Sequence, residues 1–104
     1  MNKLSLCVLQ LGKTDWRELH NISGTIDYTY MKEIKEPSDK YYDVVFIDKV
    51  LSDMEVSILQ NCAKAYACFV MDTVEETPAM KRLFMCKRAR KITGDELKDF
   101  LHHE

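Results

Sequence analysis

A buried strand followed at once by a capped helix is the feature that most constrains the fold of this chain. Asp43 to Asp48 reads Asp-Val-Val-Phe-Ile-Asp, a β-branched run typical of a central strand in a parallel sheet. Ser52 and Glu55 then form a Ser-x-x-Glu capping box, and apolar residues follow at helical spacing. This predicts a helix from about Asp53 to Lys64 and indicates an α/β domain.

The same alternation recurs along the rest of the chain. We expect further strands over Lys3 to Leu11, Thr25 to Met31, Tyr66 to Met71 and Ala89 to Ile92, and a surface loop over Lys35 to Lys40. We expect a short helix over Trp16 to His20, capped by Thr14 or Asp15, and a helix that begins with Thr77 and Pro78. A last helix is expected over Asp95 to Leu101, after a second capping box of Thr93 and Glu96. Strands separated by helical segments pair in parallel through right-handed crossovers. The predicted fold is a flavodoxin-like three-layer α/β sandwich with strand order 2-1-3-4-5, in which Val44 to Ile47 are among the most buried residues and Thr25 to Met31 is an edge strand.

Length and composition restrict the possible partners. The 104 residues are 46% hydrophobic with a net charge of -2, which indicates one folded domain over residues 1–104 and no bulk attraction to nucleic acid. No apolar run approaches the length of a membrane span, and no secretory signal opens the chain, so we expect a cytoplasmic protein without membrane insertion. The four cysteines lack Cys-x-x-Cys spacing and read as buried thiols, and we expect no metal and no cofactor. The last helix reaches the final residues without a stop signal, which suggests the N-terminal part of a longer protein.

In an open parallel sheet, ligands bind at the carboxyl ends of the strands. There we expect a ligand-binding cluster of Lys13, Asp48, Asp72 and Thr73. Lys13 follows Gly12 and precedes Thr14, which matches the end of a P-loop, but Cys7 stands where the first glycine of that loop is needed. An ordinary turn is therefore the better interpretation, and we expect no catalytic residue.

Three aromatic residues are candidates for partner binding. Ile26, Tyr28 and Tyr30 share one face of the predicted edge strand, and Trp16 lies in the short helix before it. Exposed edges are used for association, and aromatic residues are common at the centres of interfaces. Trp16, Tyr28 and Tyr30 either form a surface for a partner protein or a second copy of the chain, or they close the core.

The segment around Asp48 resembles part of a response-regulator receiver domain. Val44 to Met54 reads Val-Val-Phe-Ile-Asp-Lys-Val-Leu-Ser-Asp-Met, similar to that family's third strand and following loop, and Thr73 matches its Ser/Thr switch position. The resemblance implies that Asp48 stands at the phosphoacceptor position. Leu11-Gly12-Lys13 stands where the family has the acidic pair that holds magnesium, so the resemblance implies a degenerate domain that is not phosphorylated.

A second resemblance covers roughly residues 4 to 50. Val8 to Trp16 reads Val-Leu-Gln-Leu-Gly-Lys-Thr-Asp-Trp, and together with Ile26 to Tyr28 and Tyr42 to Asp48 it is similar to the N-terminal region of an accessory Sec system protein family. That family acts in the cytoplasm of Gram-positive bacteria on the export of serine-rich repeat adhesins. Its chemistry is ascribed to a downstream hydrolase-like domain, and this chain has no Gly-x-Ser-x-Gly motif. The resemblance implies a non-catalytic module that binds other components of a secretion complex.

Overall fold

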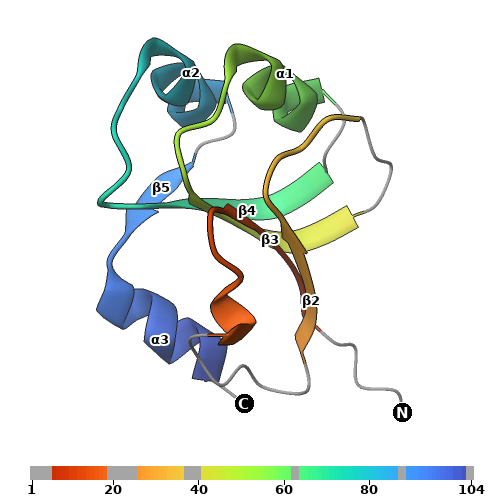
Figure 1. The fold of residues 1–104 in the computed structure, drawn as a ribbon, viewed down its shortest axis with the longest axis vertical. Helices are drawn as coiled ribbons and strands as arrows, with labels where there is room; N and C mark the ends of the chain where they lie inside the picture. The colour runs from red at the N-terminus through yellow and green to blue at the C-terminus, as the bar shows by residue number, and fades with distance from the viewer. Residues whose placement is uncertain (1–5, 19–25, 37–40, 62–63, 87–88, 103–104) are drawn as a thin grey trace.

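Five parallel strands form one sheet in the order β2-β1-β3-β4-β5, as the sequence predicted (Figure 1). The computed structural model describes residues 6–18, 26–36, 41–61, 64–86 and 89–102. The strands are β1 (Leu6–Gly12), β2 (Ile26–Met31), β3 (Tyr41–Asp48), β4 (Lys64–Met71) and β5 (Arg90–Ile92). This is the architecture of a flavodoxin-like fold, and β2 and β5 are its two edges.

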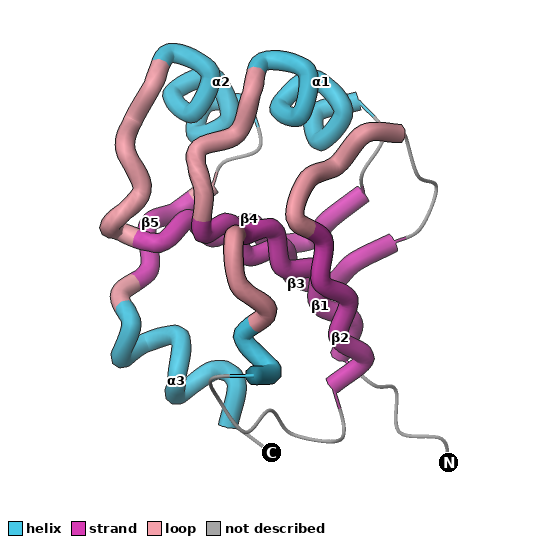
Figure 2. Tube along the Cα trace, in the orientation of Figure 1, coloured by secondary structure: helices cyan, strands magenta, loops and turns pink. Residues whose placement is uncertain are grey.

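Helices cover the two faces of the sheet unequally. Helices α1 (Asp53–Asn61) and α2 (Pro78–Cys86) lie side by side on one face (Figure 2). The other face carries α3 (Gly94–His102) and a single turn of 3-10 helix, η1 (Trp16–Glu18). No helix among the described residues is long and apolar enough to cross a membrane.

The core has one layer on each side of the central strands. Val44, Val45, Phe46 and Ile47 are all buried, as predicted, with exposures of 6% or less. Toward η1 and α3, the ring of Phe46 lies 5.7 Å from that of Trp16, 5.8 Å from that of Phe69 and 5.1 Å from that of Phe100. Alternation along β3 sends Val45 and Ile47 to the opposite layer, under α1 and α2.

Both predicted capping boxes are present. The Glu55 amide donates to Ser52 Oγ (3.2 Å) and the Ser52 amide donates to Glu55 Oε1 (3.1 Å). Thr93 and Glu96 make the same reciprocal pair at the start of α3, at 3.1 and 3.2 Å. Each pair satisfies amides that the first helical turn leaves free, which fixes where the two helices begin.

Some predicted boundaries were wrong. The helix expected to reach Lys64 ends at Asn61, because Lys64 pairs with Tyr41 as the first residue of β4. The helix expected over Trp16 to His20 is described only as the 3-10 turn, and its last two residues lie outside the described part. The described part also excludes Lys3 and Thr25, where two strands were predicted to begin, and Cys62. Most of the loop predicted over Lys35 to Lys40 lies outside it as well. Cys68 is buried and Cys7 is half-buried.

Candidate functional site

The side chain of Gln10 organises the carboxyl end of β1. Its Nε2 donates to the carbonyl of Thr14 (2.7 Å), and its Oε1 accepts hydrogen bonds from the Trp16 amide (3.0 Å) and from the Tyr28 hydroxyl. Gln10 is fully buried, so these partners replace the water that its amide would otherwise require. One side chain thereby folds the turn after β1 back over the sheet and joins it to β2.

Asp48 ends β3 beside this turn. Its Oδ2 accepts a hydrogen bond from Trp16 Nε1 (3.2 Å), and the register pairs Asp48 with Gly12. Burial raises the pKa of Asp48, while the Trp16 hydrogen bond and the nearby positive charge of Lys13 act in the opposite direction. The carboxylate is half-buried under an indole, an arrangement that holds the turn against the sheet.

Gly12 allows the close approach of these groups. A Cβ at this position would lie 3.0 Å from Gln10 Nε2 and 3.3 Å from the Cβ of Asp48. The Gly12 carbonyl also accepts a hydrogen bond from the Tyr30 hydroxyl (2.7 Å). A larger residue would have to displace the Gln10 amide or the end of β3.

Asp15 and Arg17 form the outer rim of the same cluster. Arg17 Nη2 lies 2.6 Å from Asp15 Oδ2, and the guanidinium lies 5.3 Å from the centre of the Tyr28 ring. The side-chain hydrogen bond from Arg17 lowers the pKa of Asp15, whereas burial raises the pKa of Tyr28. Tyr28 therefore remains protonated and donates to Gln10 at neutral pH.

The structure brings together only part of the predicted ligand-binding cluster. Lys13 is exposed and close enough to Asp48 to influence its ionisation. Asp72 and Thr73 are exposed in the turn after β4, and among the described residues no hydrogen bond or ion pair links either to Asp48. The described residues also contain no group of three or more His, Cys, Asp or Glu that could hold a metal ion.

Trp16 belongs to the core and not to an exposed surface. Only 4% of it is exposed, because its ring packs on Phe46 and its backbone and indole nitrogens are held by Gln10 and Asp48. Tyr28 and Tyr30 are half-buried, with their hydroxyls bonded inward. Of the three aromatic residues predicted for partner binding, Trp16 closes the core, and only Tyr28 and Tyr30 remain partly exposed on β2.

The two edge strands differ in length and charge. β2 spans six residues and contains one charged side chain, the exposed Asp27. β5 spans three residues, of which Arg90 and Lys91 are exposed. Natural sheets protect their edges by shortening them and by placing lysine, other charges or proline there. β5 has such protection, and β2 has little of it.

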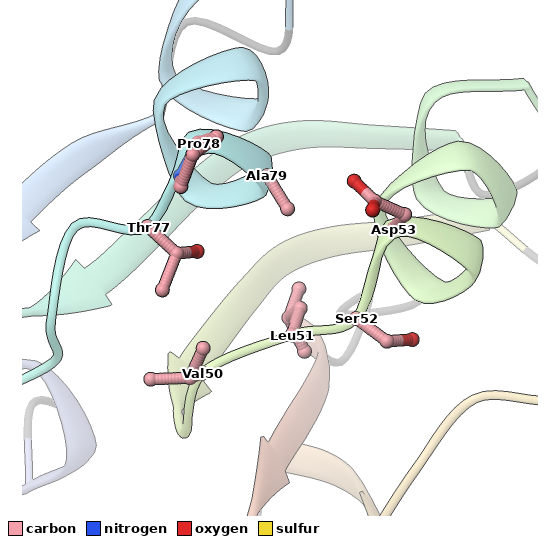
Figure 3. Close-up of a pocket in the computed structure, with 7 residues that line it drawn as sticks. All are labelled: Val50, Leu51, Ser52, Asp53, Thr77, Pro78 and Ala79. Carbon is pink, nitrogen blue, oxygen red and sulfur yellow. The ribbon is translucent and has the colours of Figure 1, made fainter.

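An open hollow of about 380 Å³ lies between the β3–α1 connection and the start of α2 (Figure 3). Its lining is mainly apolar: Val50, Leu51, Ser52, Asp53, Thr77, Pro78 and Ala79. The hydroxyls of Ser52 and Thr77 cap the two helices, since they accept the amides of Glu55 and Met80. Those hydroxyls are therefore already engaged within the fold.

Sequence reasoning missed the roles of Gln10 and Glu55. Gln10 was read only as part of a buried strand, although a lone amide inside an apolar run is a signal that it needs partners. Glu55 was recognised as a cap, but it is also buried, accepts the Ile34 amide (3.2 Å) and pairs with Lys49 Nζ (3.3 Å). Ile34 follows β2 and Lys49 follows β3, so the spacing of the capping box does not reveal these partners.

Comparisons with protein-family models, with curated proteins and with solved structures find no match to this chain.

Proposed function

We propose that this chain is a non-catalytic protein-interaction domain that docks through the outer edge of β2. The observation that carries the proposal is the edge itself. Among the described strands β2 pairs with β1 alone, it is twice as long as β5, and it lacks proline, lysine and arginine. An exposed strand of this kind offers unpaired backbone donors and acceptors to another strand.

The carboxyl end of the sheet supports a non-catalytic role. In open α/β sheets this is where substrates bind. Here Trp16 occupies the ends of β1 and β3, and the Gln10 amide and one oxygen of Asp48 are used to hold it. Side chains committed to fixing a turn are not free to bind and turn over a substrate.

The proposed setting is an accessory Sec system in the cytoplasm, with other components of the secretion complex as partners. This part of the proposal rests on the resemblance of residues 4 to 50, which includes Gln10 and Trp16. The same two residues hold the turn after β1, because the Trp16 amide donates to Gln10 Oε1. The resemblance therefore includes two residues that make a defined contact in the fold.

A degenerate receiver-like signalling domain is the second candidate. It is favoured by the strand order 2-1-3-4-5 and by Asp48 at the carboxyl end of β3, the position of a phosphoacceptor. It is disfavoured by the indole bonded to Asp48 and by Lys13 beside it.

Site-specific crosslinking in the producing cell tests the proposed function. A photoreactive amino acid in place of the exposed Asp27 on β2 is expected to crosslink to protein, either another component or a second copy. The same amino acid in place of the exposed Lys98 on α3 serves as the control. Adducts from position 98 alone, or from neither position, would contradict docking at β2.

A further inference from the structure

We propose that the strand which occupies the β2 edge is β2 of a second copy, paired antiparallel about a two-fold axis. The inference rests on the proposed docking at β2 and names its partner. The axis stands perpendicular to the sheet, so the two five-stranded sheets join into one, and the faces covered by α3 lie on the same side. Figure 1 shows β2 at one edge of the sheet.

The geometry of such a pair allows few registers. With the axis perpendicular to the sheet, residues that face each other must point to the same side, so the axis passes midway between the two copies of one residue. In the register around Tyr28, Tyr28 faces its own copy and Asp27 faces Thr29. In the register around Thr29, Thr29 faces its own copy, Tyr28 faces Tyr30 and Asp27 faces Met31.

Both registers are self-complementary. Asp27 is the only charged residue of β2, and in each register it faces an uncharged residue, so no like charges are opposed. In each register an aromatic pair, either Tyr28 with Tyr28 or Tyr28 with Tyr30, lies across the junction. Aromatic cross-strand pairs stabilise antiparallel sheets.

The opposite edge cannot associate in the same way. An antiparallel pair of β5 strands has three residues, and two of them, Arg90 and Lys91, are positively charged. In the registers centred on Arg90 or Lys91, one cation faces its own copy, and in the register centred on Ile92 only that residue of β5 faces β5 of the other copy. Self-association is therefore directed to β2, and a closed dimer results in place of an open chain of subunits. A junction of one short strand is small, so the dimer is expected to be weak and concentration-dependent.

Two substitutions of Thr29, one by a negative and one by a positive residue, test the β2–β2 pairing and its register. Thr29→Asp places carboxylates opposite each other in the register around Thr29, and opposite Asp27 in the register around Tyr28. It should weaken the dimer roughly tenfold in either case. Thr29→Lys should weaken the dimer in the register around Thr29, where two ammonium groups face each other. It should strengthen the dimer in the register around Tyr28, where the ammonium faces Asp27. The dissociation constants are measured by sedimentation equilibrium, with Arg90→Asp on β5 as the control that leaves dimerisation unchanged.

Thermal unfolding of each variant checks that it is folded. If a Thr29 variant does not fold, hydrogen exchange of the wild-type chain gives a second test: amides of β2 should become more protected as concentration rises, and those of β5 should not. A wild-type chain that is monomeric at every concentration, or a dimer that Thr29→Asp leaves intact, would overturn the self-pairing. If Asp27 then crosslinks to a different protein, the proposed function still stands and only the second copy is wrong.

Discussion

The indole of Trp16 donates to Oδ2 of Asp48 across 3.2 Å, and this contact joins the turn after β1 to the end of β3. It gives the buried indole its hydrogen-bond partner. It also occupies one oxygen of the carboxylate on which receiver chemistry would depend.

Replacing Asp48 by asparagine should stabilise the chain at neutral pH. Burial raises the pKa of Asp48, so the folded chain binds this proton more tightly than the unfolded chain does. The free energy of unfolding therefore falls as pH rises through the raised pKa, and the loss persists above it. Asp48→Asn removes that loss, and its amide oxygen can still accept from Trp16. Urea unfolding between pH 3 and pH 8 should show that the free energies of unfolding of wild type and Asp48→Asn converge only at acidic pH.

Asp15 supplies the control of opposite sign. The Arg17 hydrogen bond lowers the pKa of Asp15, so its contribution to stability is complete above the ordinary aspartate range and is lost as pH falls through the lowered pKa. Asp15→Asn should therefore be less stable than wild type at neutral pH. The same sign of effect for Asp48→Asn would contradict the assignment of Asp48.

Gly12→Ala should destabilise the fold by about 1–3 kcal/mol, because the added methyl group meets Gln10 Nε2 at 3.0 Å and the Cβ of Asp48 at 3.3 Å. Gly94→Ala is the matched control at the start of α3, where a Cβ would have no neighbour within 4 Å. That change should be neutral or stabilising by up to about 1 kcal/mol. Chemical denaturation measures both, and equal losses would argue against crowding at Gly12.

Phe46→Ala should lower the free energy of unfolding by about 3–5 kcal/mol, since the ring is fully buried and packs on three other aromatic rings. Met85→Ala, at a residue that is 82% exposed, should change it by less than about 0.5 kcal/mol. Urea unfolding followed by circular dichroism compares the two. A small effect at Phe46 would contradict its place at the centre of the aromatic layer.

Incubation with acetyl phosphate and magnesium should leave Asp48 unmodified. Lys13 follows Gly12 where receiver domains carry metal-binding acids, and Trp16 covers the carboxylate. Intact mass spectrometry detects any added phosphoryl group, and Asp48→Asn identifies whether it resides on that residue. A phosphorylated wild type and an unmodified variant would contradict this prediction, and with it the degenerate character of the receiver-like alternative.

Local patterns were sufficient to predict the elements and their order. The β-branched run in β3 and the alternation in β2 predicted a buried strand and an edge strand, because burial on one or two faces dictates the spacing of apolar residues. The boxes at Ser52 and Thr93 marked two helix starts, since a cap and its partner are three residues apart. The connection rules for parallel strands then left one simple strand order.

Tertiary structure decided how the elements are joined at the carboxyl end of the sheet. The burial of Trp16, the three partners of Gln10 and the pair of Glu55 with Lys49 depend on strands and loops that meet only in the folded chain. The end of α1 at Asn61 was likewise decided by the pairing of Lys64 with Tyr41. The sequence by itself determined which segments form strands and helices, because those preferences act over a few residues. Their mutual packing determined which polar groups are buried and which edge stays open, because each buried donor and acceptor needs a partner that only another segment can supply.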